Sequence, residues 1–133
     1  MTCTRTITTG IQTLELEHIL SVEEIQFFQQ LIRKIPLADN VLEYAVSLVH
    51  KTRPEGDQSP DIVKEYIQWG AGPRASQYLV LGAKCHAAIH GKYSPDIEDV
   101  QAIANYVLRH RIVKNYKAEA EGLTEEKIIL ELL

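Results

Sequence analysis

The residues best suited to chemistry lie in the run Gly70-Ala71-Gly72-Pro73-Arg74-Ala75-Ser76. A glycine loop that turns into a helix exposes backbone N–H groups at the positive end of the helix dipole. Arg74 adds a guanidinium at this end, where a positive charge opposes the dipole. An anionic ligand, above all a phosphate, would offset this conflict. The run indicates a phosphate contact, and a surface arginine without a ligand is the alternative interpretation.

A metal site is a second candidate, because Cys85 is followed by His86 and His90. Two imidazoles spaced i, i+4 share one face of a helix, as in the H-E-x-x-H motif of zinc proteases. The glutamate of that motif is absent here, and two ligands on one helix do not close a site. Packing and a solvated helix end are the simpler interpretation of these residues.

A phosphate-binding P-loop requires G-x-x-x-x-G-K-[ST], and the sequence excludes it. The Gly-Lys step at 91–92 is followed by Tyr93, and His86 stands where the first glycine belongs. The chain therefore cannot bind a nucleotide by that route.

Two further features could mark contacts with a partner. Trp69 could anchor an interface, since tryptophan is enriched in interface hot spots, or could be half-buried core. A basic cluster could bind an anion, although a solvated helix terminus explains it more simply. It consists of Arg109, His110, Arg111, Lys114 and Lys117.

Composition limits the class of protein. The 133 residues are 45% hydrophobic and 24% charged, which fits one folded domain. A net charge of −4 argues against nucleic acid or an anionic membrane surface as a partner. Two cysteines cannot build a disulfide framework, and no apolar run approaches a membrane span or a signal peptide. We expect a cytoplasmic protein.

Helix start and stop signals predict an all-α bundle of about six short helices without a strand. The predicted helices run from Ser21 to Pro36, Asn40 to the Arg53-Pro54 step, Ser59-Pro60 to Gly70, about Arg74 to His90, Ser94-Pro95 to Arg111, and from near Thr124 onward.

Particular residues are expected to cap these helices. Ser21 with Glu24 and Asn40 with Glu43 fit capping boxes. Each Ser-Pro pair, at 59–60 and at 94–95, fits an N-cap followed by a proline in the first turn. Gly91 fits the residue after a helix end. The helix from Arg74 is rich in small residues, so we expect it at the centre of the bundle. In the next helix, Arg109 to Arg111 are expected in the last turn, where positive charge complements the dipole.

Three ordered motifs resemble the C-terminal helical lid of MoxR-type AAA+ ATPases. They are Gly-Ala-Gly-Pro-Arg-Ala-Ser at 70–76, Gly-Lys-Tyr-Ser-Pro-Asp at 91–96 followed by Asp99-Val100, and Val-Leu-Arg-His-Arg-Ile at 107–112. The stretches at 20–24 and 44–53 are similar too. The resemblance covers about residues 20–133 and implies a lid domain there, with residues 1–19 as a linker or the end of an ATPase core.

The resemblance assigns a role to Arg74. In such ATPases the arginine of the G-x-x-P-R motif is the sensor 2 residue, which contacts the γ-phosphate of ATP held by the core domain. The resemblance also makes Gly72, Pro73 and Tyr44 candidate cofactor-binding positions. The family often has serine in place of Gly72 and arginine in place of Lys92. The first departure loosens the loop and the second keeps the charge.

The core that carries Walker A and Walker B is not found in these residues, so the chain alone is expected to hydrolyse no ATP. The resemblance implies ATP and magnesium held through the core domain, a hexameric ring, chaperone-like remodeling and von Willebrand factor A domain partners. Two alternatives stay open. One is a free-standing helical interaction module, and the other is a metal-binding or enzymatic bundle using Cys85, His86 and His90.

Overall fold

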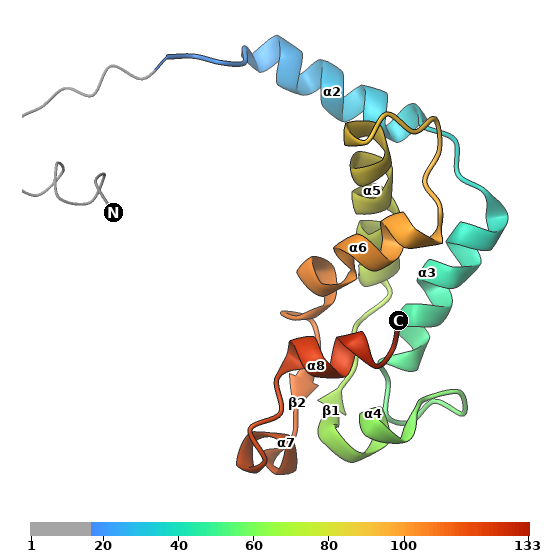
Figure 1. Cartoon of the computed structure of the whole chain (residues 1–133), viewed down its shortest axis with the longest axis vertical. Helices are drawn as coiled ribbons and strands as arrows, with labels where there is room; N and C mark the ends of the chain where they lie inside the picture. Colours follow the sequence, from blue (N-terminus) through green and yellow to red (C-terminus); the bar gives the residue numbers. More distant parts are fainter. Residues whose placement is uncertain (1–16) are drawn as a thin grey trace, which may run out of the picture.

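A computed structural model describes residues 17–133. The described part contains seven helices and one small antiparallel sheet, so the predicted all-α class is confirmed (Figure 1). The elements are α2 (Val22–Lys34), α3 (Asp39–Lys51), α4 (Asp61–Tyr66), β1 (Ile67–Trp69), α5 (Arg74–Ile89), α6 (Ile97–Leu108), β2 (Val113–Lys114), α7 (Tyr116–Ala120) and α8 (Glu125–Leu130). Most of the predicted linker, 1–16, lies outside the described residues.

Helix α5 lies at the centre of the bundle, as its small residues predict. It packs against α2, α3 and α6 (Figure 1). Its buried face consists of Ala75, Leu79, Ala83 and Ala87. At Gly82 an added Cβ would lie 2.6 Å from Cδ1 of Ile103 on α6. The small side chains therefore allow α5 and α6 to approach closely.

The end of α5 also matches the prediction. Gly91 has a φ of +73°, which glycine adopts without the penalty that a Cβ would bring. Its N–H donates to the Ala88 carbonyl, and the Lys92 N–H donates to the Ala87 carbonyl at 2.9 Å. This pair of bonds is a Schellman motif, which satisfies carbonyls left free at the helix end.

The helix starts predicted at about Arg74 and near Thr124 are correct, but of the four predicted N-terminal caps one is correct and three are wrong. The Ser21–Glu24 capping box is present. Helix α3 begins earlier than predicted, with Ala38 as N-cap and Asp39 in its first turn, so the Asn40 capping box is wrong. Asp39 favours this earlier start because a negative charge in the first turn complements the helix dipole.

The two Ser-Pro pairs do not cap helices, because other bonds replace them. Pro60 is the N-cap of α4, while the Ser59 hydroxyl donates to the Arg53 carbonyl. Asp96 caps α6 in a capping box with Asp99, two residues after Ser94. Helix α6 also ends at Leu108, so the basic residues 109–111 begin at its C-cap and do not form its last turn.

The prediction of a bundle without a strand is wrong, and α7 is an additional helix that the sequence pattern does not predict. Helix α4 ends at Tyr66, and β1 then pairs antiparallel with β2, with Ile67 opposite Lys114 and Trp69 opposite Val113. The Asn115 N–H continues the contact by donating to the Tyr66 carbonyl at 2.9 Å. The partner strand lies far along the chain, so local periodicity does not predict this pairing.

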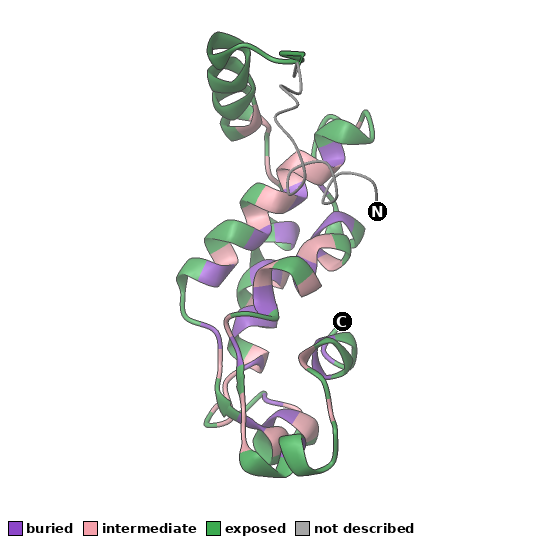
Figure 2. Cartoon of the chain, turned by 90° about the vertical axis from the view of Figure 1, so that its left-hand side faces the viewer, coloured by how far each residue is buried: buried purple, intermediate pink, exposed green. Residues whose placement is uncertain are grey.

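Helix α2 differs from the rest of the bundle, because none of its residues is buried (Figure 2). It lies at the opposite end of the molecule from the sheet (Figure 1). Apolar side chains that remain exposed along it are Val22, Ile25, Phe27, Phe28 and Leu31. No helix in the described part of the chain is long and apolar enough to cross a membrane.

Candidate functional site

Arg74 is the first residue of α5 and is exposed. Pro73 precedes it as N-cap, and α5 has no acidic residue in its first turn. Among the described residues, no carboxylate forms an ion pair with Arg74. The charge therefore stands at the positive end of the helix without compensation from residues 17–133. This arrangement can accept an anion supplied from elsewhere.

The loop before Arg74 is fixed by its surroundings. Ala71 is buried, and the Ala75 N–H donates to the Gly72 carbonyl at 2.9 Å. The Ser76 hydroxyl donates to the Pro73 carbonyl at 2.7 Å. At Gly72 an added Cβ would meet nothing within 4 Å. A serine at Gly72, the residue that the resemblance leads one to expect, would therefore fit without a change in the loop.

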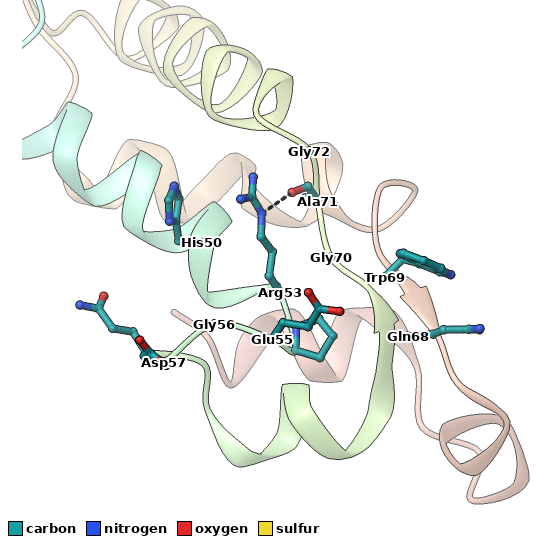
Figure 3. A pocket seen from close by; sticks show the side chains of 12 residues that line it. His50, Arg53, Glu55, Gly56, Asp57, Gln68, Trp69, Gly70, Ala71 and Gly72 are labelled. Carbon is teal, nitrogen blue, oxygen red and sulfur yellow. Dashed lines mark hydrogen bonds between the residues drawn. The ribbon is translucent and has the colours of Figure 1, made fainter.

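A pocket of about 690 Å³ lies beside this loop (Figure 3). The C-terminal end of α3, the loop at 54–58 and the segment 68–72 line it. His50 and Arg53 bring nitrogen groups to it, and Glu55 and Asp57 bring carboxylates. Gly72 lines the pocket and Arg74 follows two residues later, so the pocket opens next to the proposed phosphate contact.

Tyr44 lies outside this pocket lining. Its hydroxyl donates to the Leu133 carbonyl at 3.3 Å and accepts from Nε2 of Gln101 at 3.0 Å. These bonds link α3 to α6 and to the residues after α8. They give Tyr44 a structural role, and its assignment as a cofactor-binding residue stays a prediction.

The second motif behind the resemblance, at 91–99, forms the connection between α5 and α6. Asp99 is buried, and its carboxylate accepts from Nδ1 of His86 at 2.7 Å and Nζ of Lys92 at 3.1 Å. It also accepts from the Asp96 N–H at 2.9 Å. Lys92 donates to Asp96 as well, at 2.9 Å. The glycine, the lysine and the two aspartates of this motif therefore all contribute to one turn.

The same contacts determine the charge state of Asp99. Burial of its carboxylate would raise the pKa, but the hydrogen bond from the Asp96 backbone, together with those from His86 and Lys92, outweighs burial and holds the pKa at about 2. The pKa of Lys92 is raised, first by its hydrogen bond to Asp96 and then by that to Asp99. Asp99 is thus an ionised structural carboxylate at neutral pH.

The structure gives no support to the metal-binding alternative. His86 and His90 stack with ring centroids 4.1 Å apart, and Nδ1 of each already makes a hydrogen bond. No group of three His, Cys, Asp or Glu side chains within residues 17–133 is placed to hold a metal ion.

Most of the basic cluster faces carboxylates within the fold. Lys114 lies 3.4 Å from Glu125 and Arg109 lies 4.0 Å from Glu126, while Lys117 pairs with Glu65. Arg111 lies over the Tyr78 ring, 4.8 Å from its centroid. The cluster therefore joins segments of the fold and is not an open anion-binding patch.

Trp69 is exposed to 65%, so the half-buried core interpretation is wrong. Its side chain points away from Arg53 (Figure 3). The indole is free to contact a partner.

Sequence reasoning missed Thr52 and Arg53 as part of the site. The Ala71 N–H donates to Oγ1 of Thr52 at 2.9 Å, and Nε of Arg53 donates to the Ala71 carbonyl at 3.4 Å. Thr52 and Arg53 precede Ala71 by 19 and 18 positions, so no local pattern links them to the loop. Gly70 was the one available signal, because glycine permits two backbone segments to approach closely.

Comparison of the sequence with protein families shows which family the chain belongs to. The family described as "AAA lid domain" matches residues 59–132, more than half of the chain. The chain therefore belongs to the AAA lid domain family.

The relatives narrow the class further. The chain is 30% identical over 118 residues to the "Uncharacterized protein YeaC" of Bacillus subtilis and 28% identical over 124 residues to the "Chaperone MoxR1" of Mycobacterium tuberculosis. These matches cover 89% and 93% of this chain, and 34% and 33% of the relatives. The chain thus spans about a third of the length of these relatives. The resemblance to the lid of a MoxR-type AAA+ ATPase is confirmed.

A solved structure agrees with this assignment. The crystal structure of a "putative ATPase" from Cytophaga hutchinsonii has a TM-score of 0.82 and 28% sequence identity. The match covers 96% of this chain and 39% of that protein. The fold described here is therefore shared with one part of that larger protein.

Proposed function

We propose that this lid supplies Arg74 as the sensor 2 arginine to ATP bound on a separate core domain. The observation that carries the proposal is the exposed, uncompensated guanidinium at the start of α5, directly after a loop fixed to α3. Charge develops on the phosphate oxygens during hydrolysis, and a held guanidinium stabilises it. The same contact would couple the nucleotide state to the position of the lid.

The larger activity belongs to the same proposal. The match to a chaperone over a third of its length supports a role in chaperone-like remodeling. The proposal also includes a hexameric ring, a von Willebrand factor A domain partner and a cytoplasmic location. The exposed apolar side chains of α2 support a core domain as the partner, because such a stripe is normally covered by another part of a protein.

The test compares ATP hydrolysis by this chain joined to its ATPase core with that of an Arg74→Ala variant. We expect kcat to fall on the order of 100-fold, as for the loss of one donor to a developing charge. Arg109→Ala is the matched control, since Arg109 is also exposed but lies at the C-cap of α6. The chain alone should show no turnover and at most very weak ATP affinity. Unchanged kcat in Arg74→Ala would overturn the proposal.

A free-standing interaction module is the second candidate, and the 65% exposure of Trp69 favours it. This candidate predicts that a protein partner binds the purified chain and that Trp69→Ala abolishes binding while Arg74→Ala does not.

A further inference from the structure

The loop that leads to Arg74 is attached to the end of α3 by a buried threonine. Thr52 is 1% exposed, and its hydroxyl donates to the Val49 carbonyl at 2.6 Å. The same Oγ1 accepts the Ala71 N–H at 2.9 Å. Because the hydroxyl donates and accepts at once, its orientation is fixed by the α3 backbone. Ala71 is therefore held in a defined place relative to α3.

Arg53 bonds the other backbone polar group of Ala71, its carbonyl. Its Nε donates to the Ala71 carbonyl at 3.4 Å (Figure 3). Both backbone polar groups of Ala71 are thus bonded to two consecutive residues, Thr52 and Arg53. The Arg53 carbonyl is itself held, since the buried Ser59 hydroxyl donates to it.

The two backbones also touch directly at Gly70. A Cβ added there would lie 2.5 Å from the Thr52 carbonyl oxygen and 2.7 Å from the Arg53 Cα. Only glycine lets the loop lie this close to α3. Three kinds of contact therefore fix residues 70–71, namely the threonine hydroxyl, the arginine Nε and the glycine backbone.

We propose that Thr52 and Arg53 are positioning residues for Arg74. This inference rests on the proposed function of Arg74. Only Gly72 and Pro73 lie between Ala71 and Arg74, and the ring of Pro73 restricts one of the intervening φ angles. A shift of Ala71 therefore moves the start of α5 and its guanidinium. A displacement of about 1 Å at a reacting group can lower a rate on the order of 100-fold.

The test measures ATP hydrolysis by the chain with its core for Thr52→Val, which removes the hydroxyl with little change of shape. We expect kcat to fall on the order of tenfold, with a smaller change in KM for ATP, because Arg74 would be misplaced by part of an ångström. Thr52→Ser keeps the hydroxyl and should restore kcat. Thr124→Val is the matched control, since Thr124 also accepts a backbone N–H, at the start of α8.

A double-mutant cycle with Arg74→Ala separates positioning from general loss of stability. We expect Thr52→Val to cause no further fall in kcat once Arg74 is removed. An equal fold-loss in both backgrounds, or unchanged kcat in Thr52→Val while Arg74→Ala is impaired, overturns this inference alone. Unchanged kcat in Arg74→Ala overturns the proposed function and this inference with it.

A second variant keeps the test decisive if Thr52→Val does not fold, as judged by thermal unfolding of the same preparation. Arg53→Met keeps the length of the side chain and removes the donor to Ala71. In the same cycle with Arg74→Ala we then expect non-additive losses of kcat, and additive losses would contradict the inference.

Discussion

Helices α2 and α5 are stabilised in opposite ways. Helix α2 has strong local signals, with a capping box, acidic residues in its first turn and basic residues in its last turn, but it buries no residue. Helix α5 lacks a side-chain cap, starts with an arginine and contains Gly82, yet four of its residues are buried. Local chemistry thus defines α2, whereas packing defines α5.

The difference matters for function because the proposed site is at the start of α5. An arginine in that position and a glycine loop before it are unfavourable for an isolated helix. Contacts from α3 and α6 outweigh those costs. The start of α5 therefore depends on tertiary packing, whereas α2 depends on local interactions and leaves apolar side chains exposed.

The largest expected effect comes from removing the packing of α5. Leu79 is fully buried at the centre of the helix. Leu79→Ala should lower the free energy of unfolding by about 2–5 kcal/mol, the usual range for a buried leucine. Urea unfolding followed by circular dichroism measures it. Leu81→Ala is the control on the same helix, since Leu81 is 37% exposed and should cost much less. Equal losses for the two variants would contradict the central place of α5.

The next effect concerns the loop at the start of α5. Gly70→Ala should destabilise the fold by about 1–3 kcal/mol, as expected for overpacking. Its Cβ would lie 2.5 Å from the rigid Thr52 carbonyl oxygen. Gly72→Ala is the matched control, because a Cβ there meets nothing within 4 Å. Thermal unfolding of the two variants should show a lower melting temperature for Gly70→Ala alone, and a reversed order would refute the close approach of loop and α3.

The contribution of Asp99, in the first turn of α6, to the free energy of unfolding should depend on pH. The pKa of Asp99 is held at about 2, below the value of about 3.9 in an unfolded chain. Ionised Asp99 therefore stabilises the fold at pH above about 4, and this contribution is lost as the pH falls toward 2. Asp99→Asn should cost about 1–3 kcal/mol at pH 7, because a buried hydrogen-bonded charge is removed.

The pH dependence itself is the sharper measurement. Between about pH 5 and 2 the free energy of unfolding should fall more steeply in the natural chain than in Asp99→Asn, since the asparagine does not ionise. Asp57→Asn, in an exposed loop, is the control and should follow the natural chain. Parallel curves for the natural chain and Asp99→Asn would show that Asp99 contributes nothing to acid sensitivity.

The sequence predicts the parts of this fold that local signals determine, and it does not predict the parts that depend on long-range packing. Periodicity and the Ser21–Glu24 capping box predict α2, and Gly91 predicts the end of α5, because these signals act within one turn. The strands and the attachment of Ala71 to Thr52 depend on residues far apart in the chain. Local patterns contain no information about such contacts.

The candidate site shows the same limit. Arg74 could be singled out because its charge conflicts with the helix dipole, and that conflict is visible in a single sequence. The residues that hold its loop could not be found in this way. Thr52 is a common residue near a helix end, and only its burial and its bond to Ala71 distinguish it.

The smallest effect tests α2. Ser21→Ala removes the capping hydroxyl, which accepts the Glu24 N–H at 3.2 Å. The cap is worth about 1 kcal/mol to the helix. Because α2 buries no residue, we expect faster hydrogen exchange in its first turns while the midpoint of global unfolding stays the same. Asp96→Ala removes the equivalent cap of α6, in which four residues are buried, and should lower the global midpoint. If Ser21→Ala lowered the midpoint as much as Asp96→Ala, α2 would be part of the cooperative core. The proposal that its apolar face is kept for an ATPase core would then lose its support.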